Sequence, residues 1–194
     1  MRSLDRPSRR LGRKIDGRVP ALIGCLVVSV LLLAPSAYAY SMNLHVAAFV
    51  EVFANGASAE VRCPDSPEEW SHDLGDPLDA EEIYGRTFTR TEVVEFRSDL
   101  CPILDDLANS SADDSIKALA VLSLVHESYH VRHWQWRLNE ARVECQAIRH
   151  FRIGVRVLGG SQQLADQLFP LALTWHDRIT QNPAYYLASC VVPK

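Results

Sequence analysis

Basic residues are scarce in this sequence once its N-terminal stretch is set aside. Residues 1–39 hold seven of the 20 Lys and Arg side chains, and the remainder carries 13 Lys and Arg against 22 Asp and Glu, a net charge near −9 with His neutral. Clustered Lys and Arg are what bind the phosphates of nucleic acids and anionic lipids. Their scarcity therefore disfavours nucleic acid as a partner and gives no polybasic attraction to a membrane surface.

The cysteines lack the C-x-x-C spacing that is typical of thiolate zinc sites. Cys25 falls in the N-terminal stretch, which leaves Cys63, Cys101, Cys145 and Cys190, an even number. In an oxidising compartment such a set forms disulfides, and four cysteines allow three pairings. Moderate loop lengths favour Cys63 with Cys101 and Cys145 with Cys190, each bond stabilising the fold by about 2–4 kcal/mol.

The N-terminal stretch also lacks a long apolar run. Its basic residues are followed by the apolar residues 21–33 and by Ala37-Tyr38-Ala39, an order typical of an export signal cleaved after Ala39. A bilayer span needs roughly 20 apolar residues, so a membrane anchor over Val19–Tyr40 is the alternative. We expect a signal peptide over residues 1–39 and one extracytoplasmic domain over residues 40–194. That domain is secreted, or it is held at the outer face of the membrane by an uncleaved N-terminal segment alone.

The first half of this domain gives mixed structural signals. Within Tyr40–Arg62, short apolar runs on either side of Asn55-Gly56 predict some strand with a turn, and Ile83–Thr89 predicts another strand. After Thr91 the apolar residues recur with helical spacing. We expect a helix that Thr91 caps and that Pro102 kinks or splits, with one apolar face formed by Val93, Val94, Phe96, Leu100, Ile103, Leu104 and Leu107.

Three longer helices follow in the sequence. They run over about Asp113–His133, Leu138–Leu158 and Ser161–Thr180, with Gly159-Gly160 stopping the second and Pro170 bending the third. There is no internal repeat and no low-complexity segment. With 47% hydrophobic residues in 194 positions, the chain is long enough for one domain with a real core. The fold class expected is mainly α, about four helices with a few short N-terminal strands.

The first of these three helices carries the pattern H-E-x-x-H as His126, Glu127 and His130. Residues four apart lie one above the other on a helix face, so the two imidazoles can bind one metal ion. Glu127 points to the next sector of the face, where it can reach a water on the metal rather than the metal itself. Uncharged neighbours such as Val125 and Val131 indicate a half-buried helix. The alternative is a His pair that packs without metal.

The next helix offers candidates for a third ligand. A catalytic zinc ion typically takes three protein ligands and leaves one position to water, and Glu140 and Glu144 lie four residues apart. If the chain reverses near Gln135, the helices are antiparallel and both carboxylates face the histidines. Either one can reach the metal, and the other can accept the second ring N–H of a ligand His.

Together the two helices resemble a known family over residues 116–150. H-E-x-x-H followed by N-E-A-x-x-(acidic) is similar to the gluzincin type of zinc metallopeptidase. The resemblance implies a zincin-like domain over residues 40–194 with zinc bound by His126, His130 and Glu140. It also implies that Glu127 is the general base and that Glu144 orients a ligand His, with Glu144 as the alternative third ligand. The pattern E-A-x-x-E-C-x-A is also similar to small exported bacterial proteins of unknown function.

Three functional hypotheses follow from these observations. The first is an exported zinc metallopeptidase that hydrolyses an unidentified peptide or protein substrate. The second is a catalytically inactive zinc-binding extracytoplasmic or envelope module, and the third is a disulfide-bonded helical interaction domain without metal. Peptide hydrolysis also needs a donor to the developing oxyanion. Five side chains have suitable chemistry, and the sequence does not choose among them: Tyr129, His150, His176, Tyr185 and Tyr186.

Overall fold

The structure is a computed structural model that describes residues 41–42, 44–64, 84–88, 91–136 and 139–192. The export signal expected over residues 1–39 lies outside these ranges. All described residues belong to one compact unit, Ala39–Lys194.

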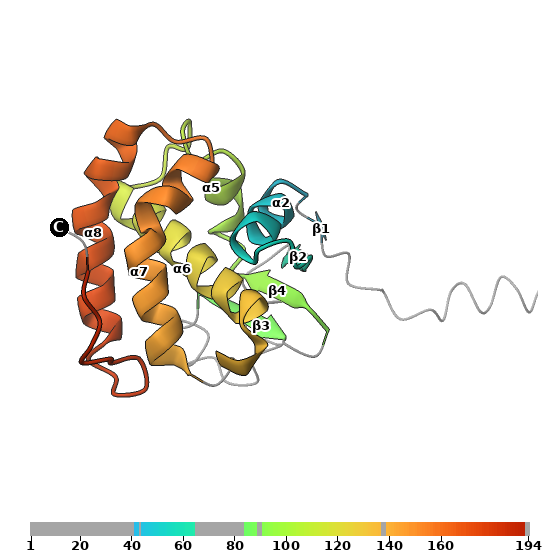
Figure 1. The fold of residues 1–194 in the computed structure, drawn as a ribbon. Coiled ribbons are helices and arrows are strands. Elements are labelled where there is room, and N and C mark those ends of the chain that lie inside the picture. Colours follow the sequence, from blue (N-terminus) through green and yellow to red (C-terminus); the bar gives the residue numbers. More distant parts are fainter. Residues whose placement is uncertain (1–40, 43, 65–83, 89–90, 137–138, 193–194) are drawn as a thin grey trace, which may run out of the picture. The chain divides into compact units, whose positions relative to one another are not determined.

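The described part of the chain is mainly helical, as expected. It contains five α-helices and a short 3-10 helix, which are α2 (Leu44–Phe53), α5 (Cys101–Asp105), α6 (Asp114–Arg132), η1 (Trp134–Trp136), α7 (Glu140–Val157) and α8 (Gln162–Ile179). Helix α6 lies in the middle, with α7 and α8 on one side and α2 and the strands on the other (Figure 1). Most of α6 is buried, so side chains on several of its faces contact other elements.

Local sequence signals set the starts of the three long helices. The side chain of Asp113 accepts a hydrogen bond from the Ser115 amide at the start of α6 (2.7 Å). Asn139 and Ser161 cap α7 and α8 in the same way. Such caps satisfy amide groups that have no partner within the helix. The end of α7 is a turn in which Gly159 has a positive φ of 82°, a conformation that glycine adopts without steric cost.

Helices α6 and α7 pack closely and run antiparallel. Gly154 on α7 lies against Val121 and Val125 on α6, and a Cβ atom added to it would be 2.7 Å from Val125 Cγ2. Further along, His130 of α6 meets Glu140 at the beginning of α7. The absence of a side chain at Gly154 thus lets the two helices approach at Val121 and Val125.

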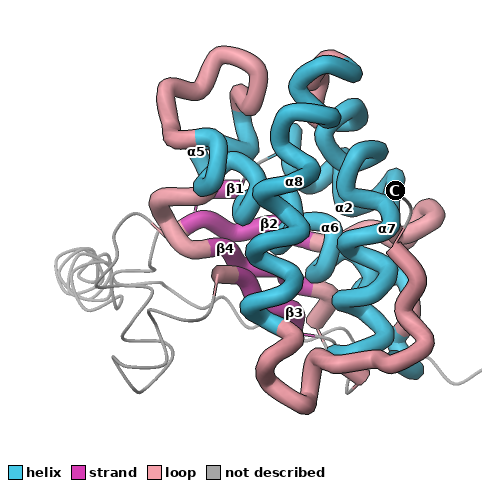
Figure 2. Tube along the Cα trace, turned by 90° about the vertical axis from the view of Figure 1, so that its left-hand side faces the viewer, coloured by secondary structure: helices cyan, strands magenta, loops and turns pink. Residues whose placement is uncertain are grey.

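The four strands form one small mixed sheet on the other side of α6 (Figure 2). Its order is β1 (Ser41–Met42), β2 (Glu60–Cys63), β4 (Val93–Phe96) and β3 (Gly85–Phe88). β2 and β4 are parallel, whereas the β1–β2 and β3–β4 pairs are antiparallel. The outer strand β3 contacts α6, and this contact brings the sheet to the half of α6 that carries the H-E-x-x-H pattern.

The helix expected from Thr91 onward is wrong in its first part. Residues Val93–Phe96 form β4, in which all four side chains are buried. This short segment between two other strands is apolar except for Glu95, and it gives no alternating pattern that would separate strand from helix. Pro102 lies in the first turn of α5, where its missing N–H leaves no hydrogen bond unmade. It therefore marks the start of a helix rather than a kink within one.

The strand signal expected within Tyr40–Arg62 is only partly right. Strands occupy the two ends of the segment, but its middle forms α2. Asn55 and Gly56, with φ of 58° and 86°, end this helix instead of joining two strands. Positive φ angles suit a helix C-terminus as well as a hairpin turn, and the dipeptide alone does not distinguish the two. The strand expected over Ile83–Thr89 is present as β3.

Two disulfide bonds tie the segments outside the helical core to it. Cys63 of β2 bonds to Cys101 of α5, and Cys145 of α7 bonds to Cys190 of the C-terminal segment. This is the pairing that the sequence favoured. Disulfides are typical of proteins that fold in an oxidising compartment. None of the described helices has both the length and the apolar composition required to cross a bilayer.

The close approach at Gly154 gives a test of the helix packing. We expect Gly154→Ala to lower the free energy of unfolding by about 1–3 kcal/mol, because the new methyl group overpacks against Val125 and Val121. Urea denaturation with the disulfides intact measures this. Ile153→Ala, at a neighbouring side chain that is 53% exposed, should cost less than about 1 kcal/mol. Equal losses in the two variants would contradict the packing described here.

Candidate metal centre

Two histidines project from one face of the second half of α6. His126 and His130 are both buried, and their ring centroids are 5.0 Å apart. Their Nε2 atoms face each other at 3.2 Å. The helical spacing thus places two imidazole nitrogens at one point, as expected from the sequence.

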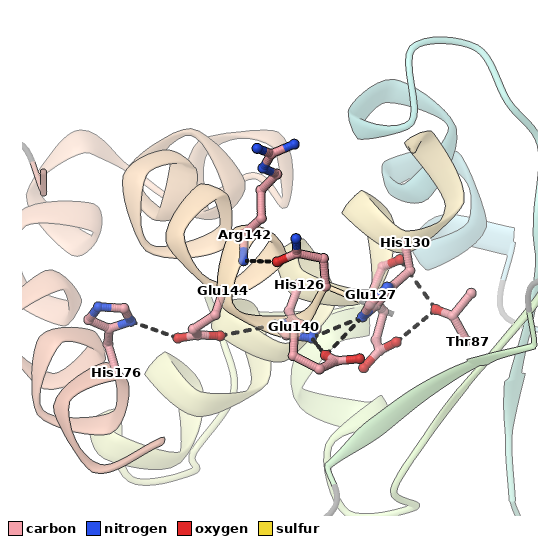
Figure 3. Close-up of polar contacts among 9 residues, drawn as sticks. Thr87, His126, Glu127, His130, Glu140, Arg142, Glu144 and His176 are labelled. Atoms are coloured by element: carbon pink, nitrogen blue, oxygen red, sulfur yellow. Dashed lines mark hydrogen bonds and ion pairs between the residues drawn. The ribbon is translucent and has the colours of Figure 1, made fainter. Parts of the chain in front are cut away.

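Glu140 adds a carboxylate oxygen to the same point. It is the first residue of α7, directly after the capping residue Asn139. Its Oε2 atom lies 3.1 Å from His126 Nε2 and 3.2 Å from His130 Nε2. Figure 3 shows the three side chains converging between the helices. We call His126, His130 and Glu140 the ligand triad, since among the described residues these three form a group that could hold a metal ion.

The spacing within the ligand triad fits a metal ion better than it fits hydrogen bonds. An ionised carboxylate carries no hydrogen, and each Nε2 carries at most one, so two hydrogens at most are available for three close contacts. Three atoms bound tetrahedrally at about 2.0–2.1 Å, as in zinc sites, are about 3.3 Å apart. The triad's separations of 3.1 to 3.2 Å are close to that value. One cation at the centre would satisfy all three atoms at once.

The carboxylate of Glu144 holds His126 from the other side of the ring. Its Oε2 atom lies 2.9 Å from His126 Nδ1, and its Oε1 atom lies 2.8 Å from Nδ1 of His176 on α8 (Figure 3). With Nδ1–H donating to Glu144, a His126 ring that has given up its Nε2 proton would turn the lone pair of Nε2 toward the triad. The contact with His176 was not expected from the sequence. It joins residues 32 positions apart on two helices, and no local pattern signals it.

The orientation of His130 is fixed by other contacts than that of His126. Its Nδ1 atom is buried and has no hydrogen-bond partner among the described residues. All the polar contacts found for this ring are made by Nε2, to His126 and Glu140. The polar interactions that fix His130 therefore come from the ligand triad itself.

The charges of the site hold a proton on His126 when no metal is bound. Burial alone would lower the pKa of His126, but the hydrogen bonds to Glu140 and Glu144 outweigh it and raise this pKa to about 10. Burial would raise the pKa of Glu140, yet the two histidines lower it to about 2. The pKa of the buried Glu144 is lowered in the same way by His126 and His176. Both carboxylates are therefore ionised at neutral pH, and they attract a cation to the triad.

Glu127 lies beside the ligand triad and accepts a hydrogen bond from a residue of the sheet. The hydroxyl of Thr87 on β3 donates a hydrogen bond to Glu127 Oε2 (2.7 Å). Gly85 on the same strand permits the approach, because a Cβ atom there would be 3.0 Å from Glu127 Cγ and from the Phe96 ring. Neither residue was singled out in the sequence as part of a site. Thr87 and Glu127 are 40 positions apart, so their meeting depends on how β3 packs on α6.

A cavity of about 450 Å³ opens next to His126 and Glu127. Of the five candidate oxyanion donors, Tyr185 lines this cavity, and its ring centroid is 6.1 Å from that of His126. Tyr129 and His150 are engaged with each other, Oη to Nδ1 at 3.0 Å. His176 is bound to Glu144, and Tyr186 lines a different hollow. The structure thus brings Tyr185 to the site, and no hydrogen bond of the kind found for Tyr129, His150 and His176 engages its hydroxyl among the described residues.

No protein-family model, curated protein or solved structure matches this chain. The chemistry of the site is therefore inferred from the two helical motifs and the positions of their side chains.

The two carboxylates are distinguishable by their effect on metal affinity. We expect Glu144→Gln to weaken zinc binding by roughly 10–100-fold, as for residues that orient a ligand His. Glu140→Gln should weaken it further because Oε2 is one of the three triad atoms. Competition with a chromophoric chelator measures both values. Glu51→Gln, at an exposed carboxylate on α2, should leave affinity unchanged. A larger loss of zinc affinity in Glu144→Gln than in Glu140→Gln would instead make Glu144 the third ligand and Glu140 the residue that orients a ligand His.

Metal binding should also depend on pH with a defined sign. Because the pKa of His126 is raised from 6.5 to about 10, zinc that binds near neutral pH must displace its proton, and apparent affinity should rise about tenfold per pH unit. Calorimetry in two buffers of different ionisation enthalpy should detect about one proton released. In the metal-free protein the charged His126 stabilises the fold fully below pH 6.5, and this stabilisation is lost as the pH rises toward 10. Affinity independent of pH between 6 and 8 would contradict this charge arrangement.

Proposed function

We propose that this protein is an exported zinc-dependent peptidase in which the ligand triad holds the metal. The observation that supports this most strongly is the triangle formed by His126 Nε2, His130 Nε2 and Glu140 Oε2, with sides of 3.1 to 3.2 Å. Two imidazoles and one carboxylate are a ligand set of catalytic zinc sites. The same set also occurs with iron in oxygenases. Glu127, placed beside the triad as a proton acceptor, favours hydrolysis.

Glu127 is the general base of the proposed reaction. A zinc ion in the triad would lower the pKa of a bound water toward about 7 and polarise the substrate carbonyl. Thr87 holds Glu127 Oε2, and the other oxygen has no hydrogen-bond partner among the described residues. Oε1 is therefore available to accept a proton from the attacking water and to return it to the leaving amine.

Tyr185 is the proposed donor to the oxyanion. Its burial and the negative charges of Glu140, Glu127 and Glu144 raise its pKa to about 12. The phenol therefore stays protonated at neutral pH and can donate a hydrogen bond. Its place in the wall of the cavity beside His126 suits a group that stabilises charge on a substrate carbonyl.

Strand β3 offers a surface for the substrate backbone. It is the last strand in the order of the described sheet, and it contacts α6 next to Glu127. An extended peptide can pair with the edge of a sheet through main-chain hydrogen bonds. A peptide alongside β3 would pass close to the ligand triad.

A zinc-binding module without catalysis is the second candidate. It is favoured by the burial of both histidines, which are 8% and 7% exposed. It is also favoured by the contact between Glu144 and His126, which would orient His126 for metal binding equally well in a protein without turnover. This module shares the metal site with the peptidase and differs in having no hydrolytic activity.

Replacing Glu127 separates the two candidates. We expect the zinc-loaded Glu127→Gln protein to keep its metal and its circular dichroism spectrum but to lose at least about a hundredfold in peptide hydrolysis, since the proton acceptor is gone. Cleavage of a fluorogenic peptide library measures the activity. Glu51→Gln serves again as the exposed control and should remain active. A wild-type protein that binds zinc but cleaves no peptide would leave the binding module as the function.

A further inference from the structure

The cavity beside the ligand triad extends away from it toward α8. His126 and Glu127 line one part of its wall. Other parts are formed by the last turn of α8 and the segment after it, with the side chains of Trp175, Arg178, Ile179, Gln181, Asn182 and Tyr185. Its volume of about 450 Å³ is in the range of pockets that take small ligands, roughly 300–1,000 Å³.

Charge is distributed unevenly along this cavity. Glu127 and Glu144 line it near the triad, and Arg178 is the sole Lys or Arg among the described lining residues. No carboxylate in the described part of the chain forms an ion pair with Arg178, in contrast to Arg152, which pairs with Asp166 at 3.0 Å. Arg178 is exposed, and in an acidic domain a cation at a cavity wall that has no carboxylate partner among the described residues can bind an anionic group of a ligand.

The guanidinium of Arg178 lies over an aromatic ring that is held by other contacts. Its guanidinium carbon lies 5.4 Å from the centroid of Trp175. The Trp175 indole N–H donates to the Ser115 carbonyl oxygen (2.9 Å), and Tyr84 meets the ring edge-on. A guanidinium on an aromatic face keeps its N–H groups free to bind a carboxylate at two points.

The lining of the cavity mixes apolar and polar side chains. Trp175, Ile179, Tyr84 and Leu122 supply apolar surface, and Gln181 and Asn182 supply polar groups. An aspartate or glutamate side chain would supply a carboxylate but would leave the apolar surface uncovered. The last residue of a peptide with an apolar side chain supplies both the carboxylate and the apolar surface.

We propose that Arg178 binds the C-terminal carboxylate of a short peptide whose last side chain is apolar and lies against Trp175. This inference rests on the proposed peptidase function and makes the protein a carboxypeptidase or dipeptidase. Water is added across the last peptide bond: the C–N bond breaks, the hydroxyl group stays on the acyl carbon, and the proton goes to the amine of the released amino acid. Arg178 determines specificity and takes no part in proton transfer.

Paired peptides test this in the zinc-loaded full chain. The substrates are acetyl-Ala-Ala-Phe as the free acid, the same peptide as its amide, and acetyl-Ala-Ala-Asp amide, which carries its carboxylate on a side chain. We expect kcat/KM for the free acid to exceed that for the Phe amide by at least about tenfold, because a charged hydrogen bond is lost in the amide. In Arg178→Gln this ratio should fall toward one. The matched control is Arg156→Gln, at an arginine of α7 that is exposed like Arg178 but is not among the residues that line the cavity, and it should keep the wild-type ratio.

Binding to a variant without the general base separates failure of the proposal from failure of the proposed function. Zinc-loaded Glu127→Gln is titrated calorimetrically with the free acid and the amide. Preferential binding of the free acid without any hydrolysis by wild type would support the carboxylate site and reject the peptidase. Hydrolysis of acid and amide at equal rates, an unchanged ratio in Arg178→Gln, or a preference for the Asp amide would overturn the C-terminal assignment. If wild type hydrolyses neither peptide and Glu127→Gln binds neither one preferentially, both the carboxylate site and the peptidase function are overturned.

Discussion

A buried carboxylate joins the three long helices of this protein. Glu144 is 1% exposed, and its two oxygens contact His126 on α6 and His176 on α8. An ionised group removed from water destabilises the fold by several kcal/mol unless polar partners compensate. The two imidazoles are these partners, so the helices must pack in the one arrangement that supplies them. That arrangement also turns His126 Nε2 toward His130 and Glu140.

The second disulfide acts on the same part of the molecule. Cys145 follows Glu144 in α7, and its bond to Cys190 holds the C-terminal segment against the helix. This segment carries Tyr185, whose side chain lines the cavity beside His126. The bond therefore restrains the proposed oxyanion donor relative to the ligand triad. On the other side of α6 the sheet has a comparable role, because β3 holds Glu127 through Thr87.

The site was predictable from the sequence where its geometry is local. The spacing of His126 and His130 acts within one helix, and both helices and their antiparallel packing were expected correctly. His176, Thr87 and Arg178 reach the site from other elements, and no spacing rule links them to it. The first half of the domain was less predictable. The mostly apolar segment Val93–Phe96 fits a strand or a helix, and Asn55-Gly56 fits a hairpin or a helix end. Tertiary packing decided both.

We propose that the ligand triad binds one metal ion with two imidazole nitrogens and one carboxylate oxygen. The most direct test is zinc K-edge X-ray absorption of the full chain after removal of adventitious metal and addition of one equivalent of zinc. We expect one tightly held zinc per chain with nitrogen and oxygen ligands at about 2.0–2.1 Å, including scattering typical of two imidazoles. No stoichiometric zinc, or a site with sulfur ligands, would contradict it.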